Sequence, residues 1–351
     1  MTNNCEQVNR REFIQTAPVV VGVLGSTAAI RAAAPTSDIR IGLYSITYGG
    51  VWYRGEALTA EQVIQRAKKF GYQGVEIDGK RPHGNPLDWP KKRCQELCRI
   101  ADGEGIEIHA VAANNDFSNP VPEVREAQIC SVTELTRMTS DLGAKNLRVF
   151  LAWWGITKHP QLATYRIAEG LWPVVHKEFT EEEIRGWCRD SLIECAKYAG
   201  DAGITLALQN HPPIIRNHDD VLRMVKEVNS PHLKICLDAP LMRDKSPAAI
   251  LQAAKAVGPL QVMSHFGGEF ERNADGSIRG YERHDGVVLG GTNRYYRDFI
   301  QAMREIGYNG YLSYELCHDL PKENGQTVGI EFAHNQARLA AEFMRGMLKE
   351  S

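Results

Sequence analysis

One local pattern recurs along this chain and constrains its fold more than any other feature. A stretch with the helical spacing of apolar residues ends in a glycine, and a short apolar run follows, as in KFGYQGVE, GEGIEIHA, DLGAKNLRV, DAGITLAL and EIGYNGYLSYE. Glycine readily adopts the left-handed conformation that ends a helix. A continuous apolar run is typical of a strand that is buried on both faces. The repetition therefore predicts helices and strands that alternate around a parallel sheet.

The whole chain after its N-terminal segment follows this pattern. The predicted strands are 39–47, 74–78, 106–112, 146–151, 204–209, 233–238, 261–265 and 311–316, and the predicted helices are 59–70, 90–104, 124–142, 180–202, 219–228, 247–257, 295–306 and 329–348. The segments 153–179 and 266–292 are expected to be long loops. A doubly wound open sheet would more often carry a glycine-rich phosphate loop after its first strand, and YSITYGGVWY has no such fingerprint. We expect an α/β fold, a single (β/α)8 TIM barrel over residues 38–351.

The first 34 residues predict a cleavable export signal. Arg10 and Arg11 precede large apolar residues, a mildly apolar stretch covers 17–30, and three alanines follow at 32–34. This order is typical of a twin-arginine signal peptide, and a disordered basic tail is the alternative. The apolar stretch is interrupted by glycines and is short for a membrane span. We expect a periplasmic or secreted protein that has no membrane attachment after cleavage.

Composition narrows the range of partners. The 351 residues are 43% hydrophobic and carry a formal net charge of -2, which is ordinary for a globular protein. A near-neutral balance argues against nucleic acid or an anionic membrane surface as a partner. The sequence is compatible with a homo-oligomer. The cysteines are not spaced as a disulfide framework, and most are expected to be buried apolar side chains.

Polar side chains stand where the predicted strands end, and in a barrel such residues face one pocket. They are Glu76 and Asp78, then His109, Trp153 and Trp154, next the run Gln209, Asn210 and His211, and finally Asp238, His265 and Glu315. An aspartate, a histidine and a glutamate after consecutive strands, with an amide oxygen from the strand before, form a mixed nitrogen and oxygen donor set. Such a set suits Mn²⁺, Mg²⁺, Co²⁺ or Zn²⁺ and gives no reason to expect an iron–sulfur cluster.

Several of these stretches resemble a known family. GYQGVEIDGKRPHG, ITLALQNHPP, HLKICLDAP, VMSHFGGE and GYLSYELCH resemble the xylose isomerase-like barrels, the sugar phosphate isomerase/epimerase group, over essentially the whole mature chain. The resemblance implies a small-molecule carbohydrate substrate and a divalent metal, with Mn²⁺ preferred. It assigns the metal to the four positions Gln209, Asp238, His265 and Glu315.

The chain departs from the family at two of these strand ends. Gln209 stands where the family commonly has a glutamate, and Leu241 stands where relatives often have a histidine. An amide oxygen can bind a hard cation but cannot act as a base. Epimerases of the family use two metal-bound glutamates, and this chain keeps Glu315 alone. One base beside a metal fits proton abstraction next to a ketone followed by loss of a leaving group, the chemistry of lyases that act on 3-keto-glycosides.

The expected roles follow from the residue types. Glu315 is the expected base, and His109 or His211 is the expected acid. The side chains expected to contact substrate are Glu76, Lys80, Arg81, His83, Trp153, Trp154 and Asn210. Each of these residue types also occurs for structural reasons alone: a histidine hydrogen-bonded in the core, a tryptophan packed against its neighbours, or an exposed lysine or arginine in solvent.

Three classes of function are compared. The first is a metal-dependent carbohydrate isomerase, epimerase or 3-keto-glycoside lyase. The second is a catalytically inactive carbohydrate-binding barrel, in which Gln209 marks the loss of chemistry. An apurinic endonuclease shares the barrel but needs more histidine ligands and a phosphate-binding surface, which this sequence does not offer.

Overall fold

The computed structural model describes residues 37–350 except 54, 160–161 and 285–286. The predicted export signal, residues 1–34, lies outside the described residues. Within them, no helix has the length and apolar character needed to cross a membrane. The seven cysteines that the structure describes are all free thiols, as expected.

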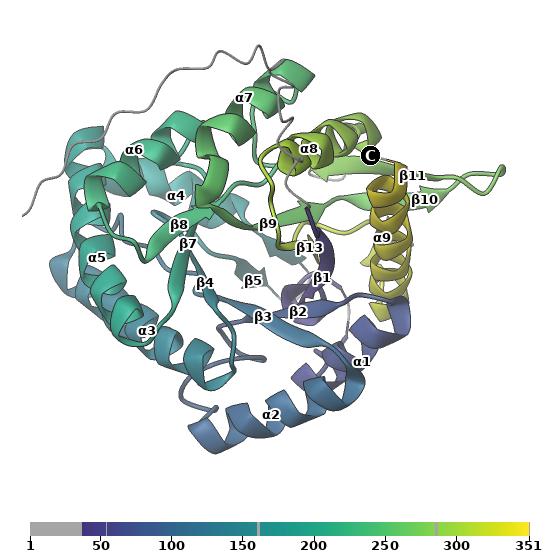
Figure 1. Ribbon diagram of the computed structural model, residues 1–351, viewed down its shortest axis with the longest axis horizontal. Helices are drawn as coiled ribbons and strands as arrows, with labels where there is room; N and C mark the ends of the chain where they lie inside the picture. The colour runs from purple at the N-terminus through teal and green to yellow at the C-terminus, as the bar shows by residue number, and fades with distance from the viewer. Residues whose placement is uncertain (1–36, 54, 160–161, 285–286, 351) are drawn as a thin grey trace, which may run out of the picture. The chain divides into compact units, whose positions relative to one another are not determined.

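Eight parallel strands close into a barrel, as the sequence predicts (Figure 1). Around the barrel they are β1 (Arg40–Tyr44), β2 (Gly74–Asp78), β3 (Glu107–Ala112), β4 (Asn146–Val149), β7 (Thr205–Gln209), β8 (Leu233–Cys236), β9 (Gln261–Gly267) and β13 (Tyr311–Glu315), and β13 pairs with β1. The first strand is shorter than predicted because the chain turns into a 3-10 helix at Ser45–Tyr48.

The predicted helices surround these strands (Figure 1). They are α1 (Ala60–Phe70), α2 (Lys91–Glu104), α3 (Pro122–Asp141), α5 (Glu181–Asp201), α6 (His218–Val228), α7 (Pro247–Val257), α8 (Asn293–Glu305) and α9 (Ile330–Glu350). Thr59 and Thr180 begin α1 and α5 with capping boxes, in which each threonine accepts a backbone N–H and its N3 partner accepts one in return. Gly71 ends α1 with φ 80°, the left-handed conformation that the recurring glycine predicts.

Alternation along each strand separates two layers of side chains. In β7, Leu206 and Leu208 belong to the main apolar core, whereas Ala207 belongs to a small separate cluster with Cys236 and Met263. Because side chains of a strand point alternately to its two faces, Gln209 lies on the same face as Ala207. That face is the barrel interior, which small side chains fill below the polar residues.

The prediction of long loops at 153–179 and 266–292 is wrong. The first segment contains an antiparallel pair, β5 (Thr157–His159) and β6 (Leu162–Thr164), and helix α4 (Arg166–His176). The second contains an antiparallel sheet of β10 (Glu269–Arg272), β11 (Ile278–His284) and β12 (Val287–Gly291). A short further pair, β14 (Lys322–Glu323) and β15 (Gln326–Thr327), follows β13. The hairpins were not predicted because antiparallel strands at a surface need no continuous apolar run.

Candidate active site

Six polar side chains from different strands meet at the carboxyl ends of the barrel: Glu76, Arg148, Gln209, Asp238, His265 and Glu315. Most of this cluster is sealed from solvent. Glu76 and His265 have no exposed side-chain area, Asp238 is 1% exposed and Arg148 is 3% exposed. Glu315 is 17% exposed and is the most accessible carboxylate of the cluster.

Arg148 lies at the centre of the cluster, and the sequence analysis did not identify it. Its Nη1 donates to Gln209 Oε1 at 3.3 Å and lies 3.8 Å from Glu315 Oε2, and its Nε pairs with Glu76 Oε1 at 3.1 Å. The guanidinium also lies over the ring of Tyr44, 4.6 Å from its centroid. Burial lowers the pKa of Arg148, but the nearby Glu76, Tyr44 and Glu315 outweigh it and hold this pKa well above its usual value. The arginine is therefore a permanent buried cation.

Asp238 and His265 form the other half of the cluster. Asp238 Oδ1 accepts the backbone N–H of His265 at 2.7 Å, and Asp238 Oδ2 lies 3.0 Å from His265 Nδ1. The second ring nitrogen of His265, Nε2, is 2.6 Å from Glu76 Oε2. Burial lowers the pKa of His265, but the two carboxylates raise it by more, so its pKa lies well above the ordinary value. His265 thus donates to a carboxylate from each nitrogen.

The amide of Gln209 connects the two halves. Its Oε1 accepts from Arg148, and its Nε2 donates to Asp238 Oδ2 at 2.5 Å. An amide can accept from a cation and donate to an anion at once, whereas a carboxylate has only acceptors. A glutamate carboxylate at this position would repel the carboxylate of Asp238 at the same short distance. The arrangement explains why glutamine, and not glutamate, is the last residue of β7.

The four positions expected to bind one divalent metal do not fit such an ion as their side chains lie here. Cys236, Asp238 and His265 offer three ligand-type atoms within 4.8 Å of one another, and this triplet is a candidate metal group. Arg148 lies between two of the expected ligands, because its Nη1 contacts both Gln209 and Glu315. The guanidinium therefore supplies positive charge where the expected set would place an ion.

The rim of the cluster carries several of the predicted substrate contacts. Lys80 Nζ lies over the ring of Trp153, 4.5 Å from its centroid, and pairs with Asp78 at 3.7 Å. The Trp154 and His211 rings are 5.5 Å apart, and all four of the predicted residues here are partly exposed. Burial lowers the pKa of His211 to about 4. A neutral His211, with Nδ1 2.5 Å from the Pro212 carbonyl, keeps its Nε2 as an acceptor, which does not suit the predicted role of acid.

Other predicted contacts lie elsewhere. Arg81 is exposed and forms a bidentate ion pair with Asp88. His83 is buried, and its ring lies against the Leu58 carbonyl. Asn210 is buried and bonds the backbone N–H and carbonyl of Asp238, so it positions that residue.

His109 lies below the cluster. The register between β2 and β3 skips from Ile108 to Ala110, which makes His109 the extra residue of a bulge. Its Nε2 bonds the Ser313 hydroxyl at 2.9 Å, its ring stacks on Tyr311, and burial lowers its pKa to about 4. Gly42 leaves room for it, since a Cβ there would lie 2.8 Å from His109 Nε2. The structure thus places His109 as a core histidine.

Some residues in contact with the cluster were not identified from the sequence. Cys236, expected to be an apolar filler, contacts both Asp238 and His265. Asp78, in contrast, was expected at the end of its strand, and it accepts from the Tyr44 hydroxyl at 3.0 Å and from Asn114 at 2.5 Å. For Arg148 the signal was present in the sequence, because a charged residue inside the apolar run NLRVF must find buried partners.

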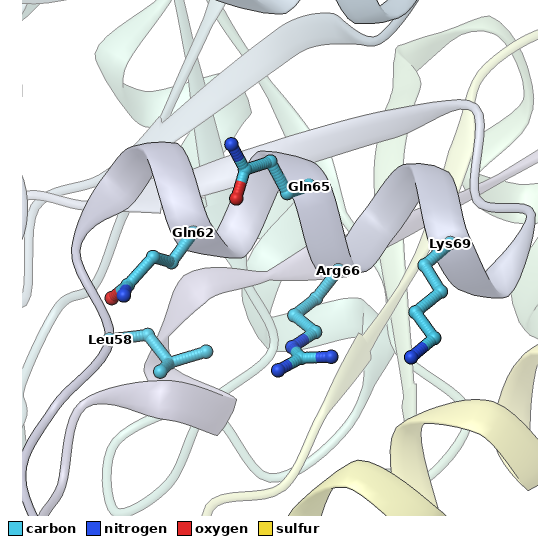
Figure 2. Close-up of a pocket in the computed structure, with 5 residues that line it drawn as sticks. All are labelled: Leu58, Gln62, Gln65, Arg66 and Lys69. Carbon is cyan, nitrogen blue, oxygen red and sulfur yellow. The ribbon is translucent and has the colours of Figure 1, made fainter.

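The described residues also line surface pockets outside the cluster. One of about 320 Å³ lies along α1 and is lined by Leu58, Gln62, Gln65, Arg66 and Lys69, all polar or basic apart from the leucine (Figure 2). It lies on an outer helix, whereas the buried charges converge inside the barrel.

A closed parallel barrel with polar side chains gathered at the carboxyl ends of its strands defines the TIM-barrel class, whose active sites lie at that end. The match to a family is more specific. The chain belongs to the xylose isomerase-like TIM barrel family, which it matches over residues 64–345. Among curated proteins, no sequence matches this chain.

Solved structures share the fold at low sequence identity. A D-psicose 3-epimerase with D-tagatose, from Clostridium cellulolyticum H10, is 20% identical with a TM-score of 0.62, covering 88% of this chain and 99% of that one. A D-psicose 3-epimerase in the presence of D-fructose is 16% identical, with the same TM-score and the same coverage of both chains. A 3-keto-D-glucoside 4-epimerase from E. coli is 16% identical with a TM-score of 0.60, covering 90% of this chain and 100% of that one.

Proposed function

We propose that this protein is a carbohydrate isomerase or epimerase that removes a proton from the carbon next to a sugar carbonyl. The observation that carries the proposal is the position of Glu315. It is the one carboxylate of the cluster with substantial exposure, at 17%, and it stands at the carboxyl end of β13. Family membership and the fold shared with sugar epimerases support this class of activity.

Glu315 is suited to act as the base. Burial raises its pKa, since the surroundings disfavour the charged form, while His265 and Arg148 act in the opposite direction. A carboxylate that is partly desolvated accepts a proton more readily than one in water. Glu76 and Asp238 are sealed and hold His265, so they are positioned as supports and not as proton acceptors for a substrate.

The rim residues are suited to bind a sugar. Trp153 and Trp154 offer aromatic faces against which a pyranose ring can stack, and Lys80 and His211 offer a donor and an acceptor for hydroxyl groups. These four side chains are partly exposed, as is Glu315, so all five are open to a ligand.

A lyase acting on 3-keto-glycosides is a second candidate. The cluster offers one accessible carboxylate, whereas epimerisation by two bases needs proton acceptors on both faces of the substrate. In elimination, Glu315 takes the proton next to the ketone. The C–H electron pair forms a carbon–carbon double bond, the bond to the glycosidic oxygen breaks with its electron pair going to that oxygen, and the oxygen takes up the proton that Glu315 has accepted.

Turnover assays separate these candidates. The full chain is incubated with D-fructose, with D-psicose and with a 3-keto-glucoside, and the products are resolved by chromatography. We expect conversion of at least one substrate, loss of conversion in Glu315→Gln, and normal conversion in the exposed control Glu323→Gln. Conversion that survives in Glu315→Gln would contradict its role as base. No conversion of any of the three would favour the inactive carbohydrate-binding barrel, tested by titration with the same sugars.

We also propose export through the twin-arginine pathway, on the basis of residues 1–34. Replacing Arg10 and Arg11 by lysine should retain the protein in the cytoplasm, which cell fractionation measures. Equal export of the variant and the parent would contradict this route.

A further inference from the structure

We propose that Arg148 takes the place of a divalent metal in this barrel. Its guanidinium is the resident cation that stabilises the negative charge formed on the carbonyl oxygen when Glu315 removes the proton. The catalytic role of Arg148 rests on the proposed function. The replacement of an ion by arginine does not depend on that function. No ion enters any step.

The first argument is the position of the guanidinium. Nη1 lies 3.3 Å from Gln209 Oε1 and 3.8 Å from Glu315 Oε2, two of the positions at which the family resemblance expects metal ligands. Nε holds Glu76 at 3.1 Å, and the aromatic faces of Tyr44 and Phe150 lie within 4.6 and 5.3 Å of the guanidinium carbon. These contacts come from several strands and hold the guanidinium between them.

The second argument is the space that the barrel provides. Arg148 on β4 pairs in register with Ala207 on β7, and Ala112 on β3 is its partner on the other side. Because both inward neighbours are alanines, a long side chain can extend across the interior without a clash. Arginine is thus accommodated by its neighbours on both adjacent strands.

The third argument is charge. The sealed part of the cluster contains two carboxylates, Glu76 and Asp238, and two groups that pair with them, Arg148 and His265. Gln209 adds no charge and needs both of its hydrogen bonds, one to the guanidinium and one to Asp238. A divalent ion placed between Gln209 and Glu315 would lie directly against the guanidinium, and two cations at such short range in a buried site repel each other strongly.

The chemical step needs a cation at this place. When Glu315 accepts the proton, the C–H bond breaks and its electron pair shifts into the new carbon–carbon double bond, while the carbonyl π pair moves to the oxygen. That oxygen becomes an enolate, and the positive charge of the neighbouring guanidinium stabilises it across the buried site. Return of the proton from Glu315, or transfer by a second group, restores the carbonyl, so no oxidant or reductant is required.

Manganese titration tests the replacement without any substrate. The full chain is purified without chelator, its metal content is measured by mass spectrometry, and MnCl₂ is titrated by calorimetry. We expect the parent to hold no stoichiometric metal. The double variant Arg148→Met/Gln209→Glu, which removes the cation and restores a carboxylate, should bind one Mn²⁺ per chain at least about 100-fold more tightly than the parent. Arg185→Met, which removes another buried arginine that pairs with Asp220 outside the cluster, should behave as the parent does.

The outcomes separate this inference from the proposed function. One Mn²⁺ bound tightly per parent chain would overturn the inference, whatever the enzyme turns over. A folded double variant that binds no better than the parent would overturn it as well. Should the double variant fail to fold, the titration of the parent still decides.

The catalytic role of the guanidinium is tested with Arg148→Lys, which keeps a positive charge but lacks the planar guanidinium group. It should lower kcat at least about 10-fold with little change in KM, and an unchanged kcat would refute a role in the step.

Discussion

Replacing Gln209 by glutamate tests the amide bridge between Arg148 and Asp238. In the structure Gln209 Nε2 lies 2.5 Å from Asp238 Oδ2, and Oε1 lies 3.3 Å from Arg148 Nη1. At an effective dielectric constant of about 20, two like unit charges repel by roughly 7 kcal/mol at the first distance. The new attraction to Arg148 contributes roughly 5 kcal/mol at the second. The lost hydrogen bond to a carboxylate adds about 1.5 to 3 kcal/mol.

These contributions leave a net cost of about 3 to 5 kcal/mol before the side chains relax, so we expect Gln209→Glu to lower the free energy of unfolding by about 3 kcal/mol at neutral pH. Urea unfolding followed by circular dichroism measures this change as a lower midpoint at constant slope. The same substitution at the exposed Gln65 on α1 is the matched control, with an expected change within about 0.5 kcal/mol. Gln209→Met separates loss of hydrogen bonds from added charge. A Gln209→Glu protein as stable as the parent, and stabilised further by Mn²⁺, would refute the bridge and identify position 209 as a metal ligand.

Two further predictions concern the core and the rim. Burial lowers the pKa of His109 to about 4, against 6.5 in the unfolded chain, so the unfolded state binds the proton first and stability should fall as pH drops from about 6.5 towards 4. The full effect is about 3 kcal/mol, and urea midpoints across this pH range should fall less steeply in His109→Gln; identical slopes would contradict the assignment. Trp153→Ala should raise KM for the sugar about 10-fold with kcat nearly unchanged, because it removes stacking without touching the base. Steady-state kinetics measures this split, and a loss confined to kcat would contradict a binding role.

The barrel itself was predictable from the sequence because its signals are local. Predicted helix 247–257 coincides with α7 (Pro247–Val257), and the predicted strand 74–78 coincides with β2 (Gly74–Asp78). Apolar runs, helix-ending glycines and capping residues act within a few positions of the chain, so they can be recognised without tertiary information.

The arrangement of the site was less predictable because it depends on register. The convergence of Asp238 and His265 follows from two neighbouring strands and was expected. That Arg148 would reach Glu315 depends on side chains from strands that are not neighbours in the barrel. The bulge that places His109 below the cluster has no sequence signal of its own. The order of the strands could be predicted, whereas the reach of a long side chain and an irregular strand register could not, and these two features determine the site.

Proton abstraction by Glu315 with Arg148 as the resident cation is tested most directly by deuterium exchange. The full chain is mixed with a 3-keto-glucoside in D₂O that contains excess chelator, and incorporation of deuterium next to the carbonyl is followed by NMR. The account predicts exchange that the chelator does not slow and that Glu315→Gln abolishes. Exchange that stops with chelator and returns with Mn²⁺ would contradict it.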